Sequence, residues 1–513
     1  MRVIGSGVMG SGIAQLAATR GVDVELADQN PAALAAAEDR LAVQLARNVS
    51  KGRMTEDEAE ATRDRIRAVD NPMARSEVDL VVEAVKENLE VKHALFRELE
   101  EVYAPNTIFA TNTSSLSVTA IGQALQDPGR LAGLHFFNPA PLMRVVEVVP
   151  GQRTAEPVVD ALVGFVRELG HHAVRTADTP GFVVNHAGRG LVTEGLQILD
   201  EGVATAADID RVARDVLGLK MGPFELLDLT GLDVSHPVLE SIWSGFYGEP
   251  RLRPSPTTRA RLQGGLLGRK SGEGFFTYRD GVKQEAPEPA PPAYEGEPVW
   301  VDDTALADLL RGAGVRLDSG PRPQEGSVVV ITPFGESVSA AGEMAGLPLG
   351  KVVGVDPLDG FAGRLTMAVH PGVAPAAGRA ALSALAMTGH AVTVTRDAPA
   401  TVAQRLLASM VNTAAEIAHR RIASATDIDI AVRLGLGYPQ GPLSWGEKVG
   451  AGRILRILEA QQQGSGDPRY RPSRWITERA LIGVPLTDEG LALADLYGRP
   501  ASAAAPDVVG ASL

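Results

Sequence analysis

The chain has 513 residues, enough for about three to five domains, and its 44% hydrophobic and 22% charged residues are ordinary for a globular protein. It contains no cysteine, which excludes disulfides, thiolate metal sites and a thiol nucleophile, and its net charge of −14 argues against a nucleic-acid partner. No apolar run approaches the ~18 residues of a membrane span, and the N-terminus lacks the charged region and apolar core of a signal peptide, so we expect a cytoplasmic protein.

The chain begins with a strand, a glycine turn and a helix. Residues 2–4 are expected to form a buried strand and residues 11–21 a helix, separated by G-S-G-V-M-G. Gly5 permits a tight turn, Gly7 lets the backbone approach a pyrophosphate, and Gly10 lets the helix pack on the strand. A glycine turn in another kind of α/β protein is the alternative. We predict a dinucleotide at the helix N-terminus, bound by Gly5, Gly7, Val8, Met9 and Gly10.

A second strand, residues 22–28, ends in an acid 18 residues after Gly10. In this setting Asp28 would accept hydrogen bonds from the adenosine ribose hydroxyls, and its charge would repel a 2′-phosphate. Gln29 and Asn30 offer no arginine in its place, so the sequence favours NAD over NADP as cofactor. The first strand starts directly after the initiator methionine, so we expect the natural start to lie upstream.

The segments that follow predict a parallel sheet with polar residues along one edge. Residues 31–67 have helical spacing and a charged face typical of a solvated helix. In an open α/β sheet, ligands gather at the carboxyl ends of the strands, where Ser114 and His135 fall. Further buried strands are expected at residues 78–85, 107–111, 130–137 and 144–150.

His135 and Glu147 are the residues most suggestive of chemistry. Glu147 lies in a run of valines, and a carboxylate there is costly without a partner. A histidine is the natural partner, and a His–Glu pair can transfer protons near neutral pH. The alternative is structural, with a hydrogen-bonded core histidine and a glutamate on an edge strand.

From residue 178 onward the pattern becomes helical. Residues 178–202 predict a long apolar helix entered through Pro180 and Gly181, and two or three more helices follow to about residue 247. Residues 268–278 form a basic, glycine-rich loop that leads into a short aromatic strand. The Pro/Glu/Ala-rich segment 285–298 marks the clearest boundary in the chain.

The second half of the chain repeats the first. A shift of 219 places residues 177–231 on residues 396–450 without gaps, with 16 of 55 positions identical. A looser similarity joins residues 327–344 to residues 106–123, the segment that contains Ser114, and residues 351–358 to the strand that carries His135. The second copy lacks the chemistry: it has no G-x-G-x-x-G, and the residues near the positions of Ser114, His135 and Asn185 are Gly335, Asp356 and Gln404. We interpret this half as the scaffold of the first without its site.

Four motifs, NTSSL at 112–116, HFFNPAPLM at 135–143, VEVV at 146–149 and TPGFVVN at 179–185, occur in the order and spacing of one family. Over residues 1–280 the chain resembles the L-3-hydroxyacyl-CoA dehydrogenases, and the tandem arrangement resembles that family's long bacterial type. The resemblance implies an enzyme that oxidises an L-3-hydroxyacyl-CoA to a 3-oxoacyl-CoA, in fatty-acid β-oxidation or phenylacetate-type catabolism, by hydride transfer to NAD.

The same resemblance implies the site residues. The catalytic group would be His135 with its partner acid Glu147, and Ser114 and Asn185 would contact the substrate. The cofactor contacts would include Asp28, Glu87, Lys92 and Lys270, and a weaker match gives Lys51 a contact with the CoA phosphate. His186 departs from the family, which usually has arginine there. No metal is implied.

The implied fold is a Rossmann-type α/β NAD-binding domain and an all-α C-terminal domain, followed by a degenerate α/β domain and a second copy of the all-α domain. Short family members pair through their helical domains, so we expect an internal pseudo-dimer, with room for a further homodimer. The expected bounds are 1–178 for the NAD-binding domain, 179–280 for the helical domain, 281–298 for a linker, 299–395 for the degenerate domain, 396–490 for the second helical domain and 491–513 for a disordered tail.

The substrate stays open between 3-hydroxyadipyl-CoA and 3-hydroxybutyryl-CoA. An adipyl tail ends in a carboxylate and would require a cation, for which the candidates are Arg144, His186 and Arg189. A non-catalytic NAD- or CoA-binding relative, crystallin-like or regulatory, is the alternative function. A sugar-nucleotide dehydrogenase would need a catalytic cysteine, and a hydratase–dehydrogenase would need a further domain.

Overall fold

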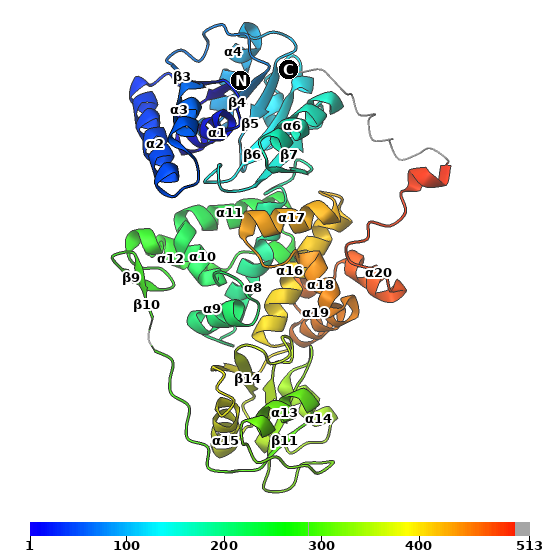
Figure 1. Ribbon diagram of the computed structural model, residues 1–513. Helices are drawn as coiled ribbons and strands as arrows, with labels where there is room; N and C mark the ends of the chain where they lie inside the picture. The colour runs from blue at the N-terminus through cyan, green and yellow to red at the C-terminus, as the bar shows by residue number, and fades with distance from the viewer. Residues whose placement is uncertain (286, 498–513) are drawn as a thin grey trace.

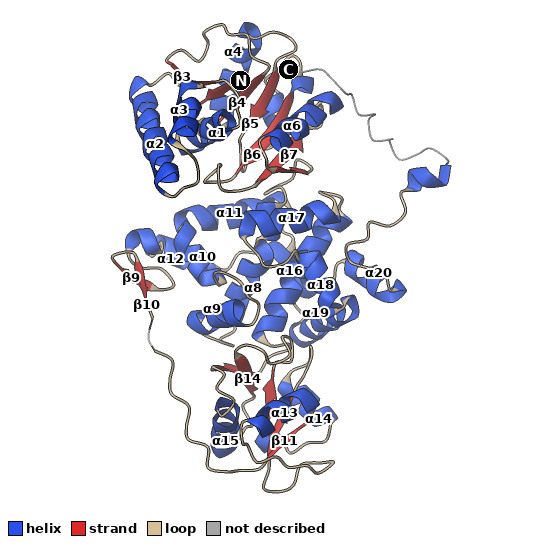
Figure 2. Ribbon diagram, viewed as in Figure 1, coloured by secondary structure: helices blue, strands red, loops and turns tan. Residues whose placement is uncertain are grey.

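The computed structural model describes residues 1–285 and 287–497. Figure 1 shows an α/β domain at each end of the molecule and a helical region between them, and Figure 2 shows that most strands belong to the two outer domains. The predicted order of an N-terminal α/β domain followed by a helical domain is confirmed.

The N-terminal domain is built on an eight-stranded sheet of order β3-β2-β1-β4-β5-β6-β7-β8. All neighbouring strands run parallel except β6 and β7. The central strands are almost entirely apolar because helices cover both faces of the sheet. The strands are β1 (Arg2–Ile4), β2 (Val24–Ala27), β3 (Ile66–Val69), β4 (Leu80–Glu83), β5 (Ile108–Thr111), β6 (Leu131–Phe136), β7 (Val145–Pro150) and β8 (His172–Arg175).

The prediction of one helical stretch over residues 31–67 is wrong, because the segment divides into two helices and strand β3. The Thr55 hydroxyl accepts a hydrogen bond from the Glu58 amide, and the Glu58 carboxylate accepts one from the Thr55 amide. This reciprocal capping starts a new helix after Ser50. The helices of the domain are α1 (Val8–Thr19), α2 (Pro31–Ser50), α3 (Glu56–Asp64), α4 (Leu89–Val102), α5 (Val118–Gly122) and α6 (Glu156–Glu168).

The first part of the helical region begins later than predicted. Residues 179–183 form a turn in which Phe182 has a φ of 46°, so the predicted long helix of 178–202 starts at Val184 and continues through Gly188. The helices are α7 (Val184–Ala187), α8 (Arg189–Asp200), α9 (Ala206–Asp215), α10 (Pro223–Thr230), α11 (Leu232–Gly245) and α12 (Pro256–Gln263).

The predicted linker of 281–298 is not wholly unstructured. Its first residues form β10 (Val282–Gln284), which pairs with β9 (Thr277–Arg279) in an antiparallel hairpin. Farther along, Glu288 forms an ion pair with the buried Arg364 of the second α/β domain. The hairpin that follows the first helical unit therefore extends past residue 280.

The second α/β domain has a five-stranded sheet of order β11-β12-β13-β14-β15. Its third and fourth strands run antiparallel and the other neighbours parallel, which is the pattern of β4 to β8. The described residues of this half contain no counterpart of β1 to β3. The elements are β11 (Val299–Val301), α13 (Thr304–Gly312), β12 (Val328–Ile331), α14 (Val338–Met344), β13 (Val352–Val355), β14 (Leu365–Val369), α15 (Pro375–Ala386) and β15 (Val392–Arg396).

The last helices pack on the first helical unit, and the two form one continuous apolar core. Helix α8 lies against α16, and a Cβ at Gly190 would be only 2.8 Å from the Cα of Met410. At the same interface the buried Arg405 forms 2.6 Å ion pairs with Glu194 and Glu201. The helices are α16 (Val402–His419), α17 (Ala425–Leu436), α18 (Pro442–Val449), α19 (Ala451–Ser465) and α20 (Arg474–Ile482).

Two sets of contacts between the helical units are reciprocal. The Ala177 amide donates to the Ile422 carbonyl at 2.7 Å, and the Arg396 amide donates to the Val203 carbonyl at 2.8 Å. These four residues are related by the 219-residue shift of the repeat. Two ion pairs repeat the pattern where η2 (Pro250–Leu252) meets η5 (Pro468–Tyr470): Arg253 with Asp467, and Arg471 with Glu249. Reciprocal contacts of this kind are the property of a two-fold interface.

The chain end differs in part from the expected disordered tail. Leu493–Tyr497 form a short 3₁₀ helix, and the rest of the predicted tail lies outside the described residues. None of the helices in the described part of the chain is long and apolar enough to cross a membrane.

The buried arginine between the helical units gives a test of their packing. We expect Arg405→Met to lower the free energy of unfolding by ~3–5 kcal/mol, because it leaves two glutamates without their cation. Arg474→Met is the control, since Arg474 pairs with Glu478 on an exposed face and should change stability by under ~0.5 kcal/mol. Equal denaturant midpoints for the two variants would show that the ion pairs of Arg405 do not stabilise the packing of the helical units.

Candidate active site

The antiparallel pairing of β6 and β7 places His135 directly opposite Glu147. The His135 Nδ1 lies 2.6 Å from the Glu147 Oε2, and both side chains are buried. The imidazole packs against the rings of Phe137 and Phe182. The carboxylate occupies Nδ1. The other ring nitrogen, Nε2, has no hydrogen bond within the described residues, so it is available to a ligand.

Glu147 also joins the α/β domain to the helical region. Its second oxygen, Oε1, accepts hydrogen bonds from the backbone amides of Val183 and Val184 at 2.9 and 2.8 Å. These amides open α7, so the carboxylate is held by two charge-assisted bonds in addition to the one to His135. The fully buried carboxylate therefore has the partners that its burial requires.

Asn185 follows these two amides directly, in the first turn of α7, and its side chain is partly exposed. Ser114 is exposed in the loop after β5, and its hydroxyl has no hydrogen bond within the described residues. In the same loop as Ser114, the Asn112 side chain accepts a hydrogen bond from the Phe136 amide at 2.8 Å. Asn112 thereby fixes the loop after β5 against the strand that carries His135.

Glu87 organises the same loop. Its Oε1 accepts hydrogen bonds from the Ser114 and Ser115 amides and from the Thr113 and Ser115 hydroxyls. Burial opposes ionisation of this carboxyl, but the bonds from Thr113 and Ser115 and the charge of Lys92 outweigh it and lower its pKa. The loop is therefore built around a charged glutamate.

Lys92 has almost no exposed surface. Its ammonium lies 2.6 Å from a Glu83 oxygen and 3.3 Å from a Glu87 oxygen. Glu83 also accepts a hydrogen bond from the Thr111 hydroxyl at 2.7 Å. Sequence reasoning missed Glu83 and Asn112, because a single acid at a strand end and one amide in a polar loop form no recognisable pattern. In the structure Lys92 positions Glu87.

The glycine turn has the shape expected of a phosphate cradle. A Cβ at Gly10 would lie 1.8 Å from the Gly5 carbonyl oxygen, whereas one at Gly7 would meet no atom within 4 Å. The open side at Gly7 lies at the start of α1, where free backbone amides favour an anion. Asp28 accepts 2.8 Å hydrogen bonds from the Ser6 amide and hydroxyl. Burial opposes ionisation of Asp28, but these bonds and one from the Asn30 amide lower its pKa.

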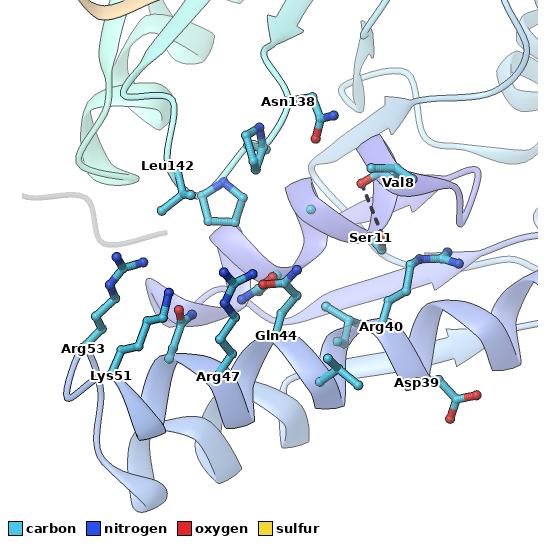
Figure 3. Close-up of a pocket in the computed structure, with 18 residues that line it drawn as sticks. Val8, Ser11, Asp39, Arg40, Gln44, Arg47, Lys51, Arg53, Asn138 and Leu142 are labelled. Atoms are coloured by element: carbon cyan, nitrogen blue, oxygen red, sulfur yellow. Dashed lines mark hydrogen bonds between the residues drawn. The ribbon is translucent and has the colours of Figure 1, made fainter. Parts of the chain in front are cut away.

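A basic cleft adjoins the glycine turn. It has a volume of about 560 Å³ and lies between α1, α2 and the loop that contains Asn138 and Leu142. In Figure 3 the side chains of Arg47, Lys51 and Arg53 extend toward that loop, and among the described residues none of the three has an ion-pair partner. Arg40, on the same helix, donates to the Ser6 carbonyl at 2.6 Å, so this part of the helix faces the glycine turn rather than solvent alone.

Two further residues complete the picture. Lys270 lies in η3 (Arg269–Ser271), where its ammonium is 2.7 Å from the Asp233 carboxylate at the start of α11. Asp178, predicted only as a boundary, accepts hydrogen bonds from the Val118 and Thr119 amides, so it ties the end of the sheet to α5. Among the predicted site residues in the described chain, Lys270 alone lies after α11, and its partner Asp233 belongs to the helical domain.

Comparison with known families finds two matching models. The first is described as "3-hydroxyacyl-CoA dehydrogenase, NAD binding domain" and matches residues 1–179. The second is described as "3-hydroxyacyl-CoA dehydrogenase, C-terminal domain" and matches twice, over residues 181–278 and 402–489. The double match coincides with the two helical units.

Individual relatives are similar over most of the chain. A 3-hydroxyadipyl-CoA dehydrogenase of Escherichia coli is 39% identical over 94% of this chain and 97% of its own. A human mitochondrial hydroxyacyl-coenzyme A dehydrogenase is 41% identical over 54% of this chain and 90% of its own. A crystal structure of 3-hydroxybutyryl-CoA dehydrogenase from Escherichia coli superimposes with a TM-score of 0.84 at 38% identity, covering 94% of this chain and 98% of that one.

The contacts of Glu147 predict the tautomer of His135. In Glu147→Gln, the amide oxygen can still accept the Val183 and Val184 amides, which turns the amide NH₂ toward Nδ1 of His135. Nδ1 must then accept, so the ring proton moves to Nε2. We expect ¹⁵N chemical shifts to report Nδ1–H in the parent protein and Nε2–H in this variant, with Glu156→Gln, on the exposed face of α6, as the unchanged control. Retention of Nδ1–H in Glu147→Gln would contradict this arrangement.

Proposed function

The chain belongs to the 3-hydroxyacyl-CoA dehydrogenase family and is an NAD-dependent 3-hydroxyacyl-CoA dehydrogenase, and we propose that His135 and Glu147 are its general acid–base pair. The observation that carries this assignment is the 2.6 Å contact between the His135 Nδ1 and the Glu147 carboxylate. It leaves Nε2 of the ring facing no described partner, which is the state in which a neutral histidine accepts a proton.

The proposed mechanism uses Glu147 as an orienting group. The carboxylate keeps the proton on Nδ1 and stabilises the imidazolium that forms when Nε2 takes the proton of the C3 hydroxyl. NAD, when bound, supplies the acceptor for the hydride that leaves C3. In the reverse direction His135 returns the proton to the alkoxide oxygen. The exposed hydroxyl of Ser114 and the amide of Asn185 would hold the substrate oxygens in line with the imidazole.

The cofactor is assigned to the glycine turn and the acid that follows it. The open space at Gly7 and the start of α1 fit a pyrophosphate, and the ionised Asp28 fits the ribose hydroxyls. The proposed cofactor contacts are those inferred from the sequence. One differs in its role: Lys92 pairs with Glu87, and Glu87 in turn holds the loop that contains Ser114 and Ser115. Lys270, which lies in the helical domain, is proposed as a further contact on the nicotinamide side of the cofactor.

The CoA end of the substrate is assigned to the basic cleft. Arg47, Lys51 and Arg53 gather positive charge there on an otherwise acidic chain. CoA carries several phosphates, and unpaired cations in a cleft favour an anion of this kind. The acyl chain would be either an adipyl or a butyryl chain, which are the chains named in the two long relatives.

We also propose that the second half of the chain replaces a partner subunit. The reciprocal hydrogen bonds of Ala177 and Arg396 and the reciprocal ion pairs of Arg253 and Arg471 support an internal pseudo-dimer. In this view residues 299–395 are a degenerate copy of the sheet and residues 396–490 a copy of the helical domain. A further homodimer of the whole chain stays open.

The polar groups of the second copy bind one another. The Gln404 side chain donates to the Asp356 carboxylate at 3.0 Å and accepts from the Gly335 amide at 2.8 Å. Thr366 lies opposite Asp356, as Glu147 lies opposite His135, and it pairs with Asp356 through the backbone. Nothing in this cluster resembles a proton-transfer pair, which supports a structural role for the second half.

The acid–base assignment is tested by His135→Gln. We expect kcat to fall by about 10²–10⁴-fold, the factor that general acid–base catalysis typically contributes. The dissociation constant for NAD should change less than ~3-fold, because the glycine turn is untouched. His172→Gln, on β8 of the same sheet and partly exposed, is the control. Near-normal turnover in His135→Gln would remove this assignment.

The pseudo-dimer is tested by a chain that ends at residue 286. Without the second half, the apolar face of α8 that meets α16 is exposed. We expect such a chain to dimerise or aggregate, as measured by size-exclusion chromatography with light scattering. A soluble, monomeric and fully active fragment would argue against the proposal.

A further inference from the structure

An unpaired cation lies one helical turn beyond Asn185. Arg189 is four residues farther along, so the two side chains share one face of the α7–α8 segment. The Arg189 Nε donates to the Asn185 carbonyl at 2.9 Å, so the side chain folds back toward the start of the helix, as long helical side chains do. The guanidinium therefore lies beside the backbone of Asn185.

Arg189 has no counter-ion. Within the described part of the chain no carboxylate pairs with it, whereas four other buried arginines have acidic partners: Arg2, Arg251, Arg364 and Arg405. Burial lowers the pKa of Arg189 to about 10, which leaves it charged at neutral pH. A desolvated cation without an anion is unfavourable, so the arrangement calls for an anion from outside the chain. The side chain is only partly buried, so a ligand can reach it.

The other two candidate cations do not meet these conditions. Burial lowers the pKa of His186 to about 3, so this ring is neutral, and it stacks on Phe246 at 4.6 Å between ring centres. Arg144 is exposed to solvent, where a carboxylate gains little from pairing. In the second copy, the position of Arg189 is taken by Ala408, which is fully buried. The packing of the helical unit therefore does not require a cation at this place.

We propose that Arg189 binds the terminal carboxylate of the substrate's acyl chain and so selects 3-hydroxydicarboxylyl-CoA substrates. The proposal rests on the assignment of His135 and Asn185 to the C3 oxygen under the proposed function. With the CoA phosphates in the basic cleft, the acyl chain leaves C3 in the other direction, toward the helical region. Because Asn185 and Arg189 share one face of the α7–α8 segment, a substrate held by Asn185 at its C3 oxygen would carry its C6 carboxylate toward Arg189. A guanidinium binds a carboxylate through two parallel hydrogen bonds.

The test compares two substrates of equal length. 3-Hydroxyadipyl-CoA and 3-hydroxyhexanoyl-CoA differ only in a carboxylate against a methyl group at C6. In the parent enzyme we expect kcat/KM to be higher for the adipyl substrate. In Arg189→Met that kcat/KM should fall by about 10–100-fold, mainly through KM, as for the loss of one charge-assisted bond. The kcat/KM for the hexanoyl substrate should stay within ~3-fold or rise, which also reports that the variant is folded.

Two further variants sharpen the result. Arg189→Lys should recover part of the preference, because the charge remains without the planar fork. Arg144→Met should leave the ratio of the two kcat/KM values unchanged. Equal losses for both substrates in Arg189→Met, or no loss for either, would overturn the role of Arg189. Failure of the parent enzyme to oxidise either substrate would instead overturn the proposed function, and the role of Arg189 with it.

Discussion

The carboxylate of Glu147 is the point on which the rest of the structure depends. One of its oxygens holds His135, and the other holds the two amides that begin α7. The first contact occupies Nδ1 of the imidazole, and the second joins the helical region to the sheet. Since Asn185 follows these amides directly, the same carboxylate places the groups from both domains relative to one another. A buried charge is tolerable here because each lone pair that needs a donor has one.

The two halves of the chain separate what the fold needs from what the reaction needs. Asp178 and Asp397 each accept amides from the helix beside them, and Asp210 and Asp429 each accept two amides across their helical unit. These contacts recur because they hold the scaffold. The histidine, its glutamate and the glycine turn do not recur, and Gln404 closes the corresponding space with its own hydrogen bonds. Because the second copy folds without this pair, a purely structural role for His135 and Glu147 is less favoured.

The sequence predicted the N-terminal α/β domain, the helical domain after it and the cofactor because each depends on local pattern. Strands such as β4 and β5 are continuous apolar runs, and the glycine turn has a fixed spacing. Strand β3 escaped prediction because Ile66–Val69 is short and half-exposed on a charged segment. The role of Asn112, the burial of Lys92 and the isolation of Arg189 depend on side chains that meet only after folding. None of these has a signature along the chain.

The reciprocal contacts between the helical units have a consequence for how the molecule behaves in dilute solution. Subunits of an ordinary dimer separate as concentration falls, whereas two units on one chain face each other at a fixed effective concentration. The interface is therefore insensitive to dilution. In a homodimer every substitution appears in both subunits. The two faces of this interface have separate sequences, so a substitution can occur in one without the other. One side can keep a site while the other drifts, which is the asymmetry that His135 and Asp356 display.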